Sequence, residues 1–128
     1  MKKAKSLPRL KAECQNVFNE FIRKRDEGLP CISCGENKLL QAGHYFPTQG
    51  YDGLRFNENN VNGECAGCNC FDDAHLIFYG ENLLDRIGGT KLALLNAAAR
   101  EYKQYGYKFT RSELIEKIEY YKQKLKLL

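Results

Sequence analysis

Two Cys-x-x-Cys pairs place the strongest constraint on how this chain can fold: Cys31-Ile-Ser-Cys34 and Cys65-Ala-Gly-Cys68. Each pair can present two thiolates to one ion, so this spacing is typical of a tetrahedral zinc site. The segment between the pairs is longer than the ~15–20 residues of a bare zinc ribbon, which leaves room for a hairpin. Four thiolates close the shell of the zinc, so we expect a structural staple with no open position for chemistry.

The composition fits a small domain that benefits from such a staple. Of the 128 residues, 43% are hydrophobic, but this share includes 8 Tyr and 6 Cys, so the aliphatic core is modest. We expect a cytoplasmic, reducing setting, because no apolar run follows the basic N-terminus and no stretch approaches the ~18 apolar residues of a membrane span. In that setting paired cysteines are metal ligands, not disulfides. The net charge of +4 permits a polyanionic partner.

The pattern of apolar residues and turn formers predicts one domain with four parts. Residues 1–8 are a flexible basic tail, either a solubilising end or an arm that seeks phosphate. Residues 9–28 are a helix, residues 29–79 are the zinc-bound core, and residues 80–128 are helical. Within the core we predict short strands at 39–42 and 54–56, and a helix that starts near residue 68. Gly80 is predicted to break a helix, and Thr110 with Glu113 to form a capping box.

Three polar residues between and after the cysteine pairs predict a phosphodiester-cleaving site. His44 can act as general base, because a neutral imidazole takes a proton from water at cell pH. Asn69 follows Cys68 directly and can hold a divalent ion, Mg²⁺ or Mn²⁺, on the leaving oxygen. The amide of Asn60 can hydrogen-bond across the loop and hold the backbone that carries His44. This order is typical of the ββα-metal, or HNH, nucleases.

The predicted fold class is therefore α+β. It comprises a small zinc-stapled ββα-metal (HNH-like) core, an N-terminal helix and a helical C-terminal part. Two cysteines lie outside the paired motif. Cys14 falls on the apolar stripe of the first helix and is expected to be buried, and Cys70 is expected to be a bystander thiol.

Several segments resemble one family closely. These are Leu29-Pro-Cys-Ile-Ser-Cys-Gly35, Ala42-Gly-His-Tyr45, Leu54-Arg-Phe-Asn-Glu58, Cys65-x-x-Cys-Asn69 and Asp85-Arg-Ile-Gly88. Together they resemble the NinG (Rap) recombination endonucleases of lambdoid phages. The resemblance implies a phage or prophage enzyme that acts in the bacterial host. Its substrates would be branched recombination intermediates such as Holliday junctions and D-loops.

The second ligand of the catalytic ion is left open by the sequence. In most HNH proteins an acidic ligand precedes the catalytic histidine, whereas this chain has Gly43, as NinG-like proteins do. Glu58 matches the family pattern. Asp73 lies four residues after Asn69, on the same helical face. Both remain candidates for the catalytic metal site.

The expected partner is branched DNA, contacted mainly through backbone phosphates by Lys and Arg, which position a protein without reading sequence. Arg55 matches the family and is the first candidate for this contact. Arg23, Lys24 and Arg25 come next, although they equally suit a solvated helix end. Paired cuts at a junction favour a homodimer, with the last helix as a candidate interface.

Two other interpretations remain open. The chain could be a non-catalytic zinc module that binds DNA or a recombination partner, with His44 in a structural role. It could also be an HNH nicking endonuclease that acts on ordinary duplex DNA.

Overall fold

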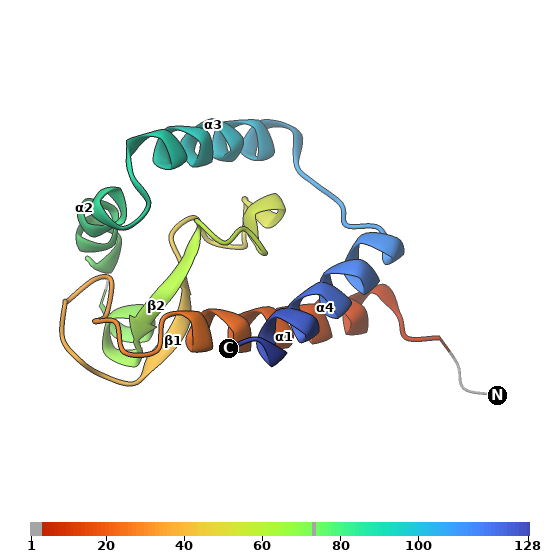
Figure 1. Ribbon diagram of the computed structural model, residues 1–128. Helices are drawn as coiled ribbons and strands as arrows, with labels where there is room; N and C mark the ends of the chain where they lie inside the picture. Colours follow the sequence, from red (N-terminus) through yellow and green to blue (C-terminus); the bar gives the residue numbers. More distant parts are fainter. Residues whose placement is uncertain (1–3, 73) are drawn as a thin grey trace.

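The computed structural model describes residues 4–72 and 74–128 and has an α+β fold. Along the chain the elements are α1 (Leu7–Arg25), β1 (Leu40–His44), the 3-10 turn η1 (Asp52–Leu54), β2 (Val61–Cys65), the π-helical turn η2 (Gly67–Phe71), α2 (His75–Ile87), α3 (Gly89–Tyr105) and α4 (Arg111–Lys126). In Figure 1, α1 and α4 lie side by side, while α2 and α3 lie on the other side of the β hairpin. No helix in the described ranges combines the length and apolarity needed to cross a membrane.

The first hydrophobic core joins α1 to α4. Phe18 is fully buried in α1, and its ring packs edge-on against Tyr121 of α4, with centroids 4.9 Å apart. The side chain of Thr110 and that of Glu113 cap the start of α4 reciprocally, which confirms the predicted capping box. Because the apolar stripe of α4 is buried against α1, it is not available as a dimer seam. Cys14 is also buried in this core, as predicted, and burial raises its pKa to about 11.

The two strands form one antiparallel hairpin. Leu40 is opposite Cys65, and His44 is opposite Val61. The register therefore places a zinc-motif cysteine at one end of the sheet and the predicted general base at the other.

A buried ion pair at the end of α1 fastens this helix to the hairpin. Asp26 is only 3% exposed, and its carboxylate accepts hydrogen bonds from Arg25 Nε at 2.7 Å and from the backbone N–H of Gly63 at 2.8 Å. Arg25 also donates to the backbone carbonyls of Glu58 and Val61, both at 2.9 Å. The pair thus satisfies two charges that would be costly to bury alone.

A second core holds α2 against the hairpin and α3. Tyr79 is fully buried, and its hydroxyl donates to the carbonyl of Gly43 at 2.7 Å while it accepts from Asn62 Nδ2 at 3.1 Å. The predicted helix break at Gly80 is wrong, because α2 runs through this position. A Cβ at Gly80 would lie 2.9 Å from the hydroxyl of Tyr45, so the glycine allows that ring to approach the helix.

The predicted strand at 54–56 is also wrong. Leu54 ends η1, and Phe56 lies in a turn, whereas the second strand is β2. Both side chains are buried, but Leu54 belongs to the core with α2 and α3, and Phe56 to the core with α1 and α4. Burial in two separate cores produced a short apolar pattern that imitates a strand.

The ends of the first helix differ slightly from prediction. The side chain of Ser6 accepts a hydrogen bond from Arg9 N, so α1 begins at Leu7, inside the predicted tail. Residues 1–3 of that tail lie outside the described ranges. The helix ends at Arg25, earlier than the predicted residue 28, and Gly28 adopts a left-handed φ of 88° in the turn that follows.

Replacing Asp26 by Ala should destabilise the fold by ~3–5 kcal/mol, because it leaves the partly buried guanidinium of Arg25 without its carboxylate. Urea denaturation of the zinc-loaded protein measures this loss. Asp85→Ala, at an exposed position of α2, is the matched control and should change stability by no more than ~0.5 kcal/mol. Equal losses in the two variants would contradict the structural role of the ion pair.

Candidate metal centre and adjoining cleft

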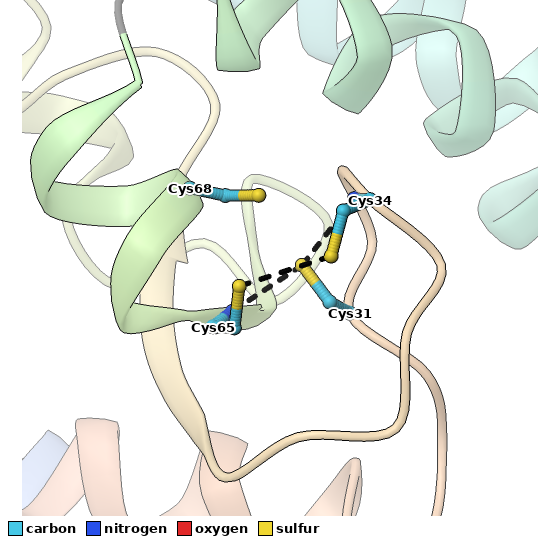
Figure 2. A group of neighbouring side chains, drawn as sticks. All are labelled: Cys31, Cys34, Cys65 and Cys68. Atoms are coloured by element: carbon cyan, nitrogen blue, oxygen red, sulfur yellow. Dashed lines mark hydrogen bonds between the residues drawn. The ribbon is translucent and has the colours of Figure 1, made fainter.

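The four cysteines of the paired motif form one cluster. Their Sγ atoms all lie within 4.8 Å of one another. Figure 2 shows the thiols pointing toward a common centre, with Cys31 and Cys34 on the loop after α1, Cys65 at the end of β2, and Cys68 in η2. Tetrahedral zinc with Zn–S bonds of ~2.3 Å requires sulfur atoms about 3.8 Å apart. The Sγ atoms of Cys34 and Cys65 are 3.8 Å apart, so the cluster can hold a metal ion such as zinc.

Backbone amides favour the thiolate form of one cysteine. Burial alone would raise the pKa of Cys31, but the N–H groups of Cys65 and Cys34 donate to its Sγ and lower the pKa to about 7. Gly35 has a left-handed φ of 74° and closes the tight turn that contains the N–H of Cys34, whereas the N–H of Cys65 comes from β2. Burial and neighbouring thiols raise the pKa of Cys68 well above its usual range, so this ligand depends on a cation to become a thiolate.

His44 is the last residue of β1 and is held in one tautomer. Its Nε2 lies 3.0 Å from the carbonyl oxygen of Arg55. Because a carbonyl can only accept, Nε2 carries the proton, and Nδ1 keeps its lone pair. Burial lowers the pKa of His44 below its usual value, and the positive charge of Arg55 adds to this effect. The imidazole is therefore neutral at pH 7 and can accept a proton at Nδ1.

Asn60 holds the backbone that follows His44. It is fully buried, and its Oδ1 accepts from the N–H of Phe46 at 2.8 Å. Its Nδ2 donates to the carbonyls of Phe46 at 3.0 Å and of Leu54 at 3.2 Å, and its own carbonyl accepts from Tyr45 N at 2.9 Å. The side-chain amide of Asn60 therefore forms hydrogen bonds across the loop, as the sequence predicted.

His44 and Asn69 line the same cleft, which has a volume of about 310 Å³. Asn69 lies in η2, directly after the metal-cluster residue Cys68, so the cluster fixes its backbone. Its Nδ2 donates to Gln41 Oε1 at 2.9 Å, so Nδ2 is engaged and the side-chain oxygen is the atom that could bind a cation. Thr48 and His75 also line the cleft.

Sequence reasoning missed Glu64, and it placed His75 on a helix surface in preference to a contact with the cation or the phosphate. His75 is the first residue of α2, and its Nδ1 lies 2.8 Å from Oε2 of Glu64, whose side chain is fully buried in β2. The only signal in the sequence was that His75 is the second of two histidines. Nothing in the local pattern predicted a glutamate pointing into the protein from the middle of a strand.

The structure does not bring Glu58 into the cleft. Its Oε2 accepts a hydrogen bond from the hydroxyl of Tyr121 at 3.1 Å, so the carboxylate faces α4 and not Asn69. The expectation that Glu58 is a catalytic metal ligand is therefore corrected by its geometry. The other candidate, Asp73, lies outside the described residues.

Two of the predicted phosphate contacts are occupied within the protein. Arg25 is committed to Asp26 and the hairpin, as described above. Arg55 pairs with Asp52 at 2.8 Å and donates to Gln15 of α1 at 3.1 Å, so its contribution to the cleft is the backbone carbonyl that orients His44. Arg23 and Lys24 are exposed and line a separate hollow of about 710 Å³.

Two cationic residues not singled out from the sequence lie on α3. Arg100 and Lys103 line a hollow of about 410 Å³ together with Phe46 and Tyr51, which belong to the loop that follows His44. The Nζ of Lys103 lies 5.2 Å from the centroid of the Tyr51 ring. Positive charge thus lies next to that loop.

The fold and the site define a small α+β protein in which a four-cysteine metal cluster supports an adjoining cleft with two histidines. Residues 1–128 match the family model described as "Bacteriophage Lambda NinG protein". The chain therefore belongs to the NinG family of lambdoid phage proteins.

Curated relatives agree with this assignment. Protein ninG of Salmonella phage P22 is 38% identical over 116 residues, which cover 89% of this chain and 55% of the relative. Protein ninG of Escherichia phage lambda is 45% identical over 78 residues, which cover 59% of this chain and 38% of the relative. The chain thus spans about half the length of these relatives or less. No solved structure matches it.

The cysteine cluster leads to a prediction with a matched control. Cys68→Ser should abolish stoichiometric zinc binding and unfold the region around the cluster, because the metal supplies much of its folding free energy. Cys70→Ser changes an exposed thiol two residues away and should keep one zinc per chain. Elemental analysis and circular dichroism measure both outcomes. A folded, zinc-free Cys68→Ser protein would show that the metal is dispensable.

Proposed function

We propose that this chain is a metal-dependent DNA endonuclease of the HNH, or ββα-metal, type. It hydrolyses phosphodiester bonds in branched recombination intermediates such as Holliday junctions and D-loops. The observation that carries the proposal is the meeting of His44 and Asn69 in one cleft, with His44 neutral and oriented. The order of two antiparallel strands, a helical turn and a helix around the cysteine cluster supports the same class.

In the proposed reaction, Nδ1 of His44 takes a proton from the attacking water. The carbonyl of Arg55 keeps Nε2 protonated and so holds the ring in the tautomer that leaves Nδ1 free. Asn60 keeps the following backbone in place and is a positioning residue. A small error in the placement of a base costs much of its effect, so a buried amide with several backbone contacts is a suitable support.

The side-chain oxygen of Asn69 would hold a divalent ion, Mg²⁺ or Mn²⁺. When bound, such an ion stabilises the negative charge that develops on the leaving oxygen. The cysteine-bound zinc has a different role, because four thiolates fill its coordination shell. It positions Asn69 and takes no part in the chemistry.

Branched DNA would be held mainly by its backbone phosphates, with binding that weakens steeply as salt rises. The exposed cations Arg23 and Lys24 remain candidates for these contacts, and Arg100 and Lys103 join them because they flank the loop after His44. Resolution of a junction needs two cuts, so we propose that two copies act together.

His44→Ala should lower the rate of junction cleavage by ~10²–10⁴-fold, because it removes the general base. Zinc content, circular dichroism and affinity for the junction should stay unchanged. Gln123→Ala, at an exposed position of α4, should cleave at the wild-type rate. The measurement is single-turnover cleavage of a labelled four-way junction with Mg²⁺ or Mn²⁺.

The same assay separates the competing functions. A wild-type protein that binds DNA but cuts neither junctions nor linear duplex with any divalent ion would be a non-catalytic zinc module. Equal rates on a junction and on linear duplex of the same sequence would remove the preference for branches and favour a nicking endonuclease.

The lowered pKa of His44 predicts the acid side of the pH–rate profile. The neutral base predominates above a pKa that burial holds below the usual value of ~6.5, so the midpoint of the decline in rate should lie below pH 6.5. Because the folded protein also disfavours the protonated ring of His44, its free energy of unfolding should decrease as the pH falls through the same range. Zinc content measured at each pH separates this decline from loss of the cluster. A midpoint above pH 6.5 would contradict the assignment.

A further inference from the structure

A buried carboxylate next to the cleft takes no part in the mechanism above. Glu64 is fully buried, and its Oε2 accepts hydrogen bonds from Nδ1 of His75 and from the hydroxyl of Ser33. The other oxygen, Oε1, has no hydrogen-bond partner among the described residues. A buried carboxylate oxygen without a partner is unfavourable unless positive charge lies nearby.

The backbone of β1 is shaped around this carboxylate. A Cβ at Gly43 would lie 2.4 Å from Oε1 of Glu64 and 2.8 Å from its Cβ. Real Cβ atoms do not approach other atoms this closely, so only glycine fits at position 43. The side chain of Glu64 fills the space that a side chain on the residue before His44 would occupy.

Glu64 also fixes the orientation of His75. A carboxylate oxygen accepts, so Nδ1 of His75 donates, and Nε2 of the neutral ring carries a lone pair. The side chain of His75 is 17% exposed and lines the cleft with His44 and Asn69. Carboxylate–imidazole pairs of this kind orient metal-binding histidines and increase their basicity.

We propose that His75, through Nε2, and Asn69, through its side-chain oxygen, form the binding site for the divalent cation of the cleft. Glu64 is the positioning residue of this site, and its negative charge lowers the free energy of the bound cation. The proposal rests on the proposed nuclease function and names the cation ligands of that site. An imidazole ligand favours a transition-metal ion such as Mn²⁺ over Mg²⁺, which binds almost entirely to oxygen.

The test measures Mn²⁺ binding to the zinc-loaded chain by isothermal titration calorimetry, without DNA. Wild type should bind one Mn²⁺ in addition to its zinc, because thiolates hold zinc in preference to Mn²⁺. His75→Ala and Glu64→Gln should each weaken Mn²⁺ binding by ~10–100-fold. Glu119→Gln removes the same charge at an exposed position of α4 and should bind Mn²⁺ as wild type does.

A second measurement does not depend on whether the variants fold. Two-bond ¹H–¹⁵N correlation spectra of the zinc-loaded wild type report which imidazole nitrogen carries the proton. The proposal expects the proton of His75 on Nδ1. A neutral ring with its proton on Nε2, or unchanged Mn²⁺ affinity in folded His75→Ala, would overturn the proposal.

The failure of this inference can be told apart from failure of the proposed function. A chain that binds Mn²⁺ through His75 but cuts no DNA would support the cation site and reject the nuclease. A chain that cuts DNA, and whose His75→Ala variant binds Mn²⁺ normally and also cuts, would reject the cation site alone.

Discussion

The structure depends on the closure of one four-sulfur cluster. Around the sulfur atoms, the buried cluster among the described residues consists of three of the cysteines and Leu40, whereas Ile32 of the first loop packs into the core with α2 and α3. Hydrophobic burial alone is therefore a weak source of stability in this region. Metal–thiolate bonds, which contribute ~10–16 kcal/mol in small zinc-finger peptides, would take its place.

The cluster also determines the positions of the residues in the cleft. Asn69 follows Cys68 in the chain, and Glu64 precedes Cys65, so both are one peptide bond from a metal ligand. Ser33 lies within the first Cys-x-x-Cys loop and donates to Glu64, which in turn holds His75. Tyr79 ties α2 to β1 through the carbonyl of the residue before His44. Asn69 and His75, which both line the cleft, are thus held by the same cysteine cluster. A shared support of this kind keeps the residues of a site in a fixed geometry.

The sequence predicted those features that depend on spacing along the chain. The thiolate pairs and the capping box are local patterns that the structure confirms, and it places His44 and Asn69 in one cleft with Asn60 holding the backbone of Phe46 nearby. The sequence could not predict which charged side chains form ion pairs or hydrogen bonds inside the protein. Arg25 suits a DNA contact and Glu58 suits a metal ligand by residue type alone. In the fold, however, Arg25 pairs with Asp26 and donates to the carbonyl of Glu58, 33 residues away, while Glu58 accepts from Tyr121, 63 residues away.

Gly43 illustrates the same limit at the site itself. In the sequence, Gly43 stands at the position where most HNH proteins have an acidic metal ligand, and the sequence alone leaves open which residue supplies a carboxylate there. In the structure, Oε1 of Glu64 lies next to Gly43, so the adjacent strand β2 supplies a carboxylate beside the residue that precedes His44. The glycine and the glutamate are therefore one feature: a side chain at position 43 would displace the carboxylate that holds His75.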